Sequence, residues 1–596
     1  EQKPEGSMVY RFGGDEFIVF IPGDRHDTAE KYIKRVYDIM EQHSLFISHG
    51  IIYTKPGSGK SFDDYLVSAD TKMYQLKQQR KQKKDSNFLK GVDISSVPMM
   101  VDNNIQIMDR EGHVCRVFDF LKLNNVNSVR LRIWNEPDKV PESKGYCSLT
   151  YVLEMAHIIK KYKMHFLLDF HYSDYWADPG QQNKPDAWKN LSFDELKEAV
   201  HKYTYDVLYR LKIMDCAPDM VQIGNEIRSG MLFPDGAVPQ YRQLAALVNE
   251  GIRAVRELLP ETKVMIHLDQ GGRYNCIMPW FDSMFNAGML PIDAIGLSFY
   301  SFWHGTFMDL KDTMSRLIKL YNLPVYIVET AHPWRHCKGE HISKELMETA
   351  GLDAGSAEQK KSLEIIMQIA AEVSKDTGKT GVYYWEPVGV PGKGMGTWFE
   401  NMGMFDEHGR ALPCWDAIRD FDPKNPPIKE LDKYIESLYE YEKTPEVEGF
   451  MKLLMIHGNL ISNPEFKDGF NNWQIETSLE EGQYTLGKDG VFISSDANFD
   501  YSISQTVDIE YTGEYIAAVD YRGTNTTGVE VELFMDVEDE SGVHTYTSDV
   551  FPDDIRFVTH LLKPVRLQKN ARVTVGLRMH TPPVFAKIKK FSLVVI

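Results

Sequence analysis

Short apolar runs alternate with longer amphipathic stretches through the middle of this chain. The runs are apolar along most of their length, which is typical of strands covered on both faces. The stretches between them have helical spacing, as in Tyr241–Leu259, where leucine, valine and isoleucine recur every three or four residues. These β-then-α units predict an α/β (β/α)8 barrel with enlarged loops over residues 86–425. Its strands are expected at Leu89–Ile94, Ser128–Trp134, Met164–His171, Asp219–Glu226, Lys263–Asp269, Ile292–Tyr300, Pro324–Thr330 and Gly381–Pro387.

The pattern changes on the N-terminal side of the predicted barrel, in residues 1–85. Two strand-like runs flank Gly13-Gly14, which predicts a β-hairpin with a Gly-Gly turn. Helices near Thr28–His43 and Phe62–Gln82, with a strand near Phe46–Tyr53, complete a partial α+β segment.

The pattern of apolar and polar positions changes again on the C-terminal side of the predicted barrel, so the chain is expected to be multidomain. Residues 426–456 resemble a linker with a short charged helix near Lys429–Tyr441. In residues 457–596, turn residues separate short strand-like runs, which predicts an antiparallel β-sandwich. Its strands are expected at Tyr501–Val507, Glu514–Tyr521, Val529–Asp536, Val558–Lys563, Ala571–Met579 and Phe591–Ile596.

The composition narrows the class of partner. The formal net charge of −19 argues against nucleic acid or an anionic membrane, and a neutral ligand suits this surface better. No apolar run approaches the length of a membrane span, and no C-x-x-C pair indicates a zinc or redox site. The oligomeric state is left open.

Two carboxylates stand at predicted strand ends. Strand four ends Gln222-Ile-Gly-Asn-Glu226, and strand seven ends Ile327-Val-Glu-Thr330. Catalytic residues of such barrels lie at the C-terminal ends of strands, and glycoside hydrolysis needs two carboxyl groups. One glutamate alone would be taken for a salt-bridged structural acid. Two, with Asn225 before Glu226, indicate a glycosidase with Glu226 and Glu329 as its working pair.

Sequence motifs around the expected strand ends resemble glycoside hydrolase family 53. They are Gly91-Val-Asp-Ile-Ser95, Ser128-Val-Arg-Leu-Arg-Ile-Trp134, Asp169-Phe-His-Tyr-Ser-Asp-Tyr-Trp-Ala-Asp-Pro-Gly180, Gln222-Ile-Gly-Asn-Glu-Ile-Arg-Ser-Gly230, Ile266-His-Leu-Asp-Gln270, Gly296-Leu-Ser-Phe-Tyr300, Val328-Glu-Thr-Ala331 and Gly381-Val-Tyr-Tyr-Trp-Glu-Pro387. The resemblance implies a retaining endo-β-1,4-galactanase acting on (arabino)galactan or galacto-oligosaccharides without a required cofactor. It implies Glu226 as acid/base and Glu329 as nucleophile.

The same resemblance assigns further residues to substrate binding. Arg132 would keep Glu329 ionised, and Asn225 would hold the sugar 2-hydroxyl. His171 and Tyr300 would line the same subsite, and Trp385 would stack beneath it. Trp176 and Trp303 would stack more distant sugars, while Trp134 is equally explained by core packing. The segment Trp398–Asn401 is expected to shape the cleft, and Asp169 to be a buried hydrogen-bonding residue.

The N-terminal segment resembles the GGDEF domain of diguanylate cyclases. The match rests on Gly13-Gly-Asp-Glu16, Ser48-His-Gly-Ile51 and Ala69-Asp-Thr-Lys-Met-Tyr74, and covers the C-terminal half of that domain. The resemblance implies a nucleotide site at Gly13, Gly14, Asp15 and Glu16, with Glu16 on the metal. In that family the N-terminal half of the domain supplies a metal-binding Asp. Because the match does not include that half, we expect this segment to be inactive.

Several alternatives stay open. The barrel could be another β-glycanase of the same clan, a binding-only protein, or the sugar sensor of a cyclase. A structural calcium ion is possible after strand seven, where Glu340, Glu345, Glu348 and Asp353 lie without ordered ligand spacing. The opening Asn459–Trp473 resembles carbohydrate-binding modules, with Trp473 expected to pack in the core. Galactan indicates an extracellular location, whereas a GGDEF segment indicates the cytoplasm.

Overall fold

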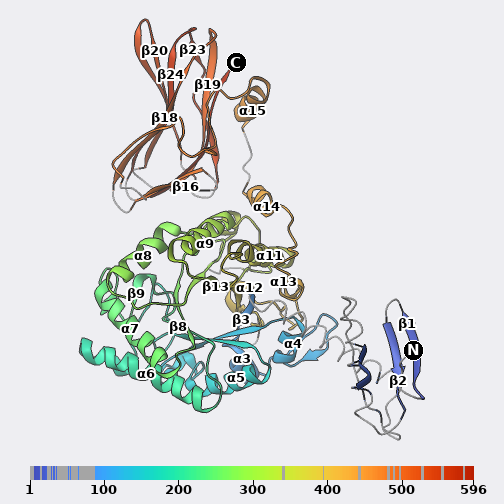
Figure 1. The fold of residues 1–596 in the computed structure, drawn as a ribbon. Coiled ribbons are helices and arrows are strands. Elements are labelled where there is room, and N and C mark those ends of the chain that lie inside the picture. Colours follow the sequence, from blue (N-terminus) through green and yellow to red (C-terminus); the bar gives the residue numbers. More distant parts are fainter. Residues whose placement is uncertain are drawn as a thin grey trace. The chain divides into compact units, whose positions relative to one another are not determined.

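The computed structural model describes residues 6–13, 16–22, a few positions between 29 and 65, and most of 88–596 (Figure 1). The gaps after residue 88 are 338–341, 393–394, 440–443, 480–482, 488–489, 496–497, 525–528, 552, 554–555 and 582–583. The chain divides into two compact units, residues 1–87 with 119–125 and residues 88–118 with 126–596. None of the helices in the described part is long and apolar enough to cross a membrane.

The first unit contains the predicted hairpin. Strands β1 (Met8–Gly13) and β2 (Glu16–Phe20) pair antiparallel, with Gly13 opposite Glu16. Gly13 therefore belongs to the first strand, and its assignment to the turn was wrong. Gly14 and Asp15 lie outside the described residues, as do most of Thr28–His43 and nearly all of Phe46–Tyr53 and Phe62–Gln82.

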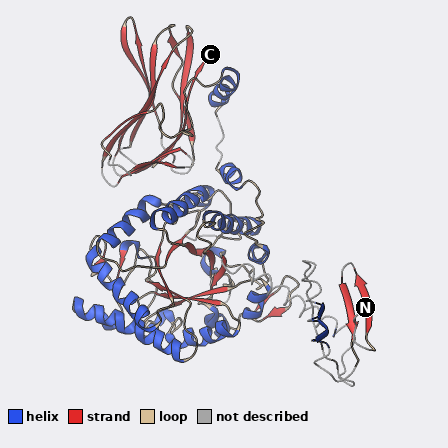
Figure 2. Ribbon diagram, in the orientation of Figure 1, coloured by secondary structure: helices blue, strands red, loops and turns tan. Residues whose placement is uncertain are grey.

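The second unit begins with the barrel, in which eight parallel strands close on themselves (Figure 2). All eight predicted runs form barrel strands. They are β3 (Phe88–Asp93), β6 (Ser128–Ile133), β7 (His165–Phe170), β8 (Met220–Ile223), β11 (Lys263–Leu268), β12 (Ala294–Ser298), β13 (Val325–Thr330) and β14 (Thr380–Trp385). Several stop before their predicted ends: β8 ends at Ile223, so Glu226 lies in the turn that follows.

Amphipathic helices surround these strands (Figure 2). In α7 (Tyr241–Leu258) the apolar residues predicted to share a face are buried, which confirms that helix. Helices α6 (Phe193–Ile213) and α9 (Phe307–Tyr321) each begin with a capping box, from Ser192 and Thr306, that satisfies free backbone N–H groups. The helices are α3 (Val97–Asp102), α4 (Val117–Leu123), α5 (Leu149–Lys161), α6 (Phe193–Ile213), α7, α8 (Tyr274–Asn286), α9 (Phe307–Tyr321), α10 (Lys344–Thr349), α11 (Ser356–Val373), α12 (Trp398–Asn401) and α13 (Cys414–Asp420).

An apolar layer fills the lower part of the barrel interior. It is built from Leu167, Met220, Met265, Ala294, Tyr326, Val328 and Tyr383, all buried. The Tyr383 ring lies where a side chain on Gly91 would be, since a Cβ there would come within 2.2 Å of it. The polar side chains therefore lie in the layer nearer the C-terminal ends of the strands, where the candidate site is found.

The C-terminal segment is a β-sandwich with one large apolar core. A five-stranded sheet runs β15-β18-β24-β20-β21, and β16-β17-β25-β19-β22 form the other, with β23 beside β19. The six predicted strands are confirmed as β18 (Phe499–Asp508), β19 (Gly513–Gly523), β20 (Glu530–Asp539), β22 (Val558–Leu561), β24 (Arg572–Thr581) and β25 (Val584–Val595). Those not predicted are β15 (Gln474–Thr477), β16 (Tyr484–Gly487), β17 (Gly490–Ser495), β21 (Gly542–Asp549) and β23 (Val565–Leu567).

Two helices precede the sandwich where one was predicted. They are α14 (Leu431–Leu438) and α15 (Pro445–His457), and residues 440–443 between them lie outside the described part. Lys311 of α9 binds Asp432 of α14 at 2.6 Å, whereas Phe450 of α15 packs in a cluster with Val594 of β25. Each helix thus has its own packing partner.

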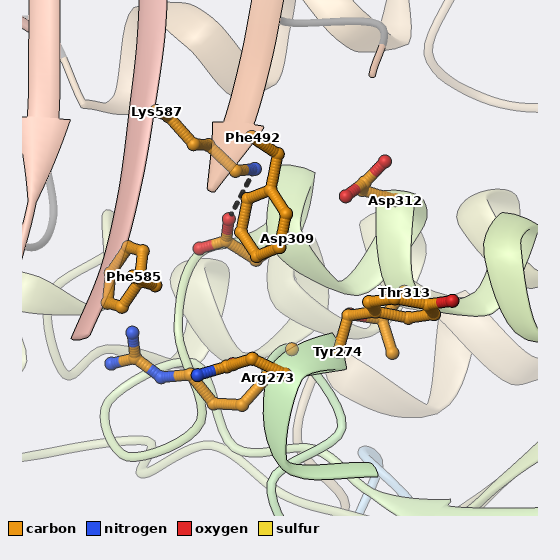
Figure 3. Close-up of a pocket in the computed structure, with 10 residues that line it drawn as sticks. Arg273, Tyr274, Asp309, Asp312, Thr313, Phe492, Phe585 and Lys587 are labelled. Atoms are coloured by element: carbon orange, nitrogen blue, oxygen red, sulfur yellow. Dashed lines mark hydrogen bonds and ion pairs between the residues drawn. The ribbon is translucent and has the colours of Figure 1, made fainter. Parts of the chain in front are cut away.

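A buried ion cluster joins α9 to strands of the sandwich. The Asp309 carboxylate accepts hydrogen bonds from Arg522 at 2.7 and 3.1 Å and from Lys587 at 3.0 Å. Figure 3 shows Lys587 and Phe585 beside Asp309. These three residues help to line a cavity of about 10 Å³. That volume holds one water molecule at most, so this cavity is no sugar site.

Candidate active site

Glu226 and Glu329 are brought together at the C-terminal ends of the barrel strands. An oxygen of one carboxylate lies within 4.8 Å of an oxygen of the other. Glu329 is the penultimate residue of β13. Glu226 follows β8 in a left-handed conformation, with a φ of 49°. Strained backbone of this kind is common where a side chain is held for a functional task.

Glu226 is the more buried of the two. Its Oε1 accepts a hydrogen bond of 2.5 Å from the Ser298 hydroxyl, and the residue is 9% exposed. Burial raises the pKa of Glu226 well above its usual value, and the negative charges of Glu329 and Asp269 raise it further. Glu226 is therefore the protonated member of the pair.

Glu329 is held as the anion by two donors. The Tyr300 hydroxyl donates to its Oε1 at 2.9 Å, and the Arg130 guanidinium lies 3.3 Å from its Oε2. Burial raises the pKa of Glu329 as well, but the charge of Arg130 and the hydrogen bond from Tyr300 oppose that rise. Because two adjacent carboxylates resist simultaneous ionisation, the pair holds one proton, and these donors direct it to Glu226.

Arg130, rather than Arg132, is the arginine at Glu329. Its guanidinium is fully buried and binds Asp93 and Asp169, each at 2.8 Å, and Asn225 at 2.9 Å. These acceptors hold the Arg130 guanidinium in place, so its positive charge is already positioned beside Glu329.

Our prediction that Arg132 would contact the nucleophile was therefore wrong. Arg132 binds Glu386 at 2.7 Å, and its guanidinium lies 4.3 Å from the Trp176 ring centre. Both arginines of β6 point to the same side of the strand, because side chains alternate with a period of two. Because barrel strands are staggered, the arginine that lies level with Glu329 is Arg130, two positions before Arg132.

His171 and Asn225 lie in the same polar layer. The Ala177 backbone N–H donates to Nδ1 of His171 at 3.1 Å, so Nε2 carries the hydrogen and donates to Asp169 at 3.0 Å. The Asn225 amide donates to the Ala177 carbonyl at 2.9 Å. Asp169 is fully buried, as expected of a residue that orients its neighbours.

Aromatic side chains line the approach to the carboxylates. Trp176 and Trp385 are half-buried, with ring centres 6.2 Å apart. Trp303 is 37% exposed and lies 5.5 Å from the Tyr300 ring. Trp134 is buried and packs on Trp176 at 5.3 Å, which favours the core alternative for this residue.

Phe399 lies in the segment Trp398–Asn401, which was expected to shape the cleft, although the sequence did not single out this residue within it. It is 44% exposed, and its ring centre lies 4.9 Å from that of Trp385. It belongs to the run Trp398–Asn401, whose residues all have positive φ, from 47° to 61°. Buried Glu400 accepts a hydrogen bond from the Ile342 backbone N–H at 3.1 Å, which helps to hold this unfavourable turn.

Glu386, the residue after Trp385, is a third buried glutamate. It lies fully inside the protein with a φ of 48° and accepts hydrogen bonds from Arg132 and from Ser96. Burial raises the pKa of Glu386 to about 7, against the opposing charge of Arg132. With no exposure to a ligand, it orients Arg132 rather than touching substrate.

Other predicted site residues lie partly outside the described residues. Gly14 and Asp15 are not described, and neither is the side chain of Glu16. The same holds for Glu340 and for the side chains of Glu345 and Glu348. The Asp353 carboxylate lies 2.8 Å from His336 Nε2. Calcium binding stays a prediction.

The family model for glycosyl hydrolase family 53 matches residues 89–418, more than half of the chain. The chain belongs to glycosyl hydrolase family 53. It is therefore a glycoside hydrolase, and the matched residues span every barrel strand described above. A second family model, "Diguanylate cyclase, GGDEF domain", matches residues 2–83, which confirms the second resemblance.

Relatives of this family 53 chain align with its barrel. A protein of Niallia circulans named "Uncharacterized protein in bgaB 5′region" is 39% identical, over 56% of this chain and 94% of that one. Arabinogalactan endo-β-1,4-galactanase A of Emericella nidulans is 32% identical, over 54% of this chain and 91% of its own length. The solved family 53 catalytic domain of Ignisphaera aggregans is 35% identical, with a TM-score of 0.52, over 56% of this chain and 96% of that one.

Proposed function

We propose that the barrel hydrolyses β-1,4-galactosidic bonds within (arabino)galactan with retention of configuration. The observation that carries the mechanism is the spacing of the two carboxylates, whose nearest oxygens lie within 4.8 Å. Retaining glycosidases hold their carboxyl groups about 5–5.5 Å apart, whereas inverting ones leave about 6.5–9.5 Å for a water molecule. The gap here leaves no room for that water.

In the first step Glu226 gives its proton to the glycosidic oxygen while Glu329 attacks the anomeric carbon. The bond to the leaving sugar breaks, and a covalent ester forms between the galactosyl unit and Glu329. In the second step Glu226, now ionised, takes a proton from a water molecule that displaces Glu329. The substrate, the two carboxyl groups and water supply every atom that is exchanged in this cycle.

The neighbouring side chains fit these steps. Arg130 and Tyr300 keep Glu329 ionised for attack. Asn225 uses one amide N–H for the Ala177 carbonyl, and we assign its second to the sugar 2-hydroxyl, a contact that strengthens in the transition state. Trp385 would stack beneath the same sugar.

Endo-cleavage requires sugars to bind on both sides of the bond that breaks. Trp176, Trp303 and Phe399 are further aromatic side chains of this approach, and Trp303 and Phe399 are exposed. Their faces suit the apolar faces of successive galactose rings, and the polymer is neutral, which agrees with the net charge of −19.

The substrate class rests on relatives named arabinogalactan endo-β-1,4-galactanase. The test is release of reducing ends from β-1,4-galactan, β-1,4-mannan and β-1,4-xylan at equal mass. We expect the wild-type chain to act on galactan, and Glu226→Gln and Glu329→Gln each to abolish that activity. Preference for mannan or xylan would overturn the galactan assignment but leave the glycosidase, whereas full activity of Glu329→Gln would overturn the mechanism.

Carbohydrate binding by the sandwich is a separate prediction. Trp473 packs between Phe466 and Phe591, with ring centres 4.9 Å away in both cases, and is 8% exposed. As expected, it serves the core rather than a ligand. Affinity electrophoresis in galactan-containing gels tests binding by this segment. It compares the full-length Glu329→Gln variant with the same variant lacking residues 457–596.

A further inference from the structure

Two buried side chains that the mechanism above leaves unused connect to Glu226. Ser298 is the last residue of β12, and His267 lies in β11, and both are fully buried. The Ser298 hydroxyl is 2.5 Å from Oε1 of Glu226, and Nε2 of His267 is 2.8 Å from the same hydroxyl. A continuous hydrogen-bonded chain thus runs from the catalytic acid into the protein.

The far nitrogen of His267 faces a backbone donor. The Glu226 backbone N–H points to Nδ1 at 3.4 Å. The Gln222 side-chain amide nitrogen lies 3.0 Å from Nδ1, but it also lies 2.5 Å from Oδ1 of Asp169 and 3.1 Å from the Gly224 carbonyl oxygen. Oδ1 of Asn225 also lies 3.0 Å away, but it accepts a hydrogen bond from Arg130 at 2.9 Å and lies 3.3 Å from the Gln222 amide nitrogen, so donors already face both of its lone pairs. Nδ1 is therefore an acceptor, and the ring hydrogen belongs on Nε2.

His267 is neutral in this environment. Burial lowers the pKa of His267 well below its usual value, and the charge of Arg130 lowers it further. A neutral ring with its hydrogen on Nε2 must donate to Ser298. The Ser298 hydroxyl, whose oxygen accepts from His267, is then directed at Oε1 of Glu226.

This direction decides which oxygen of Glu226 carries the catalytic proton. Oε1 already accepts a hydrogen bond from Ser298, so a proton on Oε1 would face another O–H hydrogen. Oε2 has no hydrogen-bond partner among the residues that the structure describes, and it is the oxygen left for a ligand.

We propose that His267 and Ser298 are positioning residues that hold Oε1 of Glu226 as an acceptor, so that the proton for the leaving group resides on Oε2. The proposal rests on the proposed glycosidase function. We call His267 and Ser298 together the relay. No bond forms or breaks within it, because the proton moves only between Glu226 and the glycosidic oxygen. In the second step the same two residues hold the carboxylate while Oε2 receives the proton from water.

The relay also contributes to the electrostatics of Glu226. The groups facing this carboxyl are Glu329 and Asp269, which raise its pKa, and Ser298 and Arg130, which lower it. Asp269 is in turn paired with Arg228 at 2.9 Å. Loss of the Ser298 hydroxyl therefore raises the pKa of Glu226, and the basic limb of the pH profile moves to higher pH.

The test compares two substrates whose leaving groups differ in their need for a proton. Galactotetraose needs acid assistance, whereas a 2,4-dinitrophenyl β-galactobioside does not, and kcat/KM reports the first step for both. For Ser298→Ala we expect kcat/KM on galactotetraose to fall about 10-fold or more, with less than about a 2-fold change on the dinitrophenyl substrate. Ser298→Thr, which keeps the hydroxyl, is expected to restore most of the loss.

Ser301→Ala is the matched control, since Ser301 is also buried but its hydroxyl has no hydrogen-bond partner in the described structure. We expect wild-type kinetics and pH profile from it. Equal losses on both substrates in Ser298→Ala, or an unmoved basic limb, would overturn the relay. A failure of the proposed glycosidase function would give a different result. Glu329→Gln would then retain activity on both substrates, whatever the effect of Ser298→Ala.

Discussion

Replacing Arg130 by methionine separates the roles of the two arginines on β6. Arg130 is the fully buried cation shared by Asp93, Asp169 and Glu329, at 2.8, 2.8 and 3.3 Å. Methionine fills similar space without the charge. Removing one partner of a buried ion pair costs about 3–5 kcal/mol, because the remaining charge is left without compensation. We expect the free energy of unfolding of Arg130→Met to fall by about that amount.

The same change alters the pH dependence of catalysis. Arg130 lowers the pKa of Glu329, so its removal raises that pKa and the nucleophile is protonated over a wider range. Since attack requires the carboxylate, the acidic limb of kcat/KM moves to higher pH and activity at neutral pH falls.

Arg132→Met is the matched variant. It leaves Glu386 without its partner at 2.7 Å and has a comparable cost in stability, but it does not remove the cation at Glu329. Urea unfolding and pH profiles of kcat/KM on galactan measure both effects. A shift of the acidic limb in Arg132→Met, and none in Arg130→Met, would refute our assignment of Arg130 to the nucleophile.

The remaining predictions concern the cleft and the buried charges. Phe399→Ala should raise KM for long galactan several-fold with little change in kcat, whereas an unchanged KM would show that Phe399 touches no sugar. Because the native pKa of Glu386, about 7, lies above that of an unfolded glutamate, the contribution of Glu386 to wild-type stability should fall as pH rises from about 4.5 to 7. Glu386→Gln should flatten that slope, measured by urea unfolding, and an unaltered slope would contradict it. Asp309→Asn should destabilise the full chain by about 3–5 kcal/mol at neutral pH, since Arg522 and Lys587 lose their partner. Although burial alone would raise the pKa of Asp309, these cations outweigh it and lower that pKa, so the stabilisation should be lost as pH falls through the acidic range. The nearby Asp312→Asn is the control, and equal losses in both variants would refute the special role of Asp309.

The architecture could be predicted because it rests on local patterns. Apolar runs of strand length, separated by helical spacing such as that of Tyr241–Leu259, specify a barrel whatever the loops contain. Strand β21 was missed because its residues are largely exposed, so it lacks the alternation of a half-buried strand. The short β23 was missed because its three residues are too few to form a pattern.

The carboxylate pair could be predicted because each glutamate ends an apolar run. Its partners could not, since they depend on the stagger of strands around the barrel. Arg130 and Arg132 alternate identically in the sequence, and only the closed sheet places the first level with Glu329. Ser298 belongs to the motif Gly296-Leu-Ser-Phe-Tyr300, but a small residue at the end of an apolar strand gives no sign that it contacts Glu226. Phe399 reaches the cleft through a left-handed turn that depends on distant contacts.

The stereochemistry of the first product distinguishes a retaining enzyme from an inverting one. Proton NMR of galactotetraose hydrolysis, recorded within the first minutes, identifies the anomer released before mutarotation. Because the carboxylate oxygens lie within 4.8 Å of each other, we expect the β-anomer to appear first and the α-anomer only later. Initial release of the α-anomer would contradict it, because inversion needs space for a water molecule that this pair does not leave.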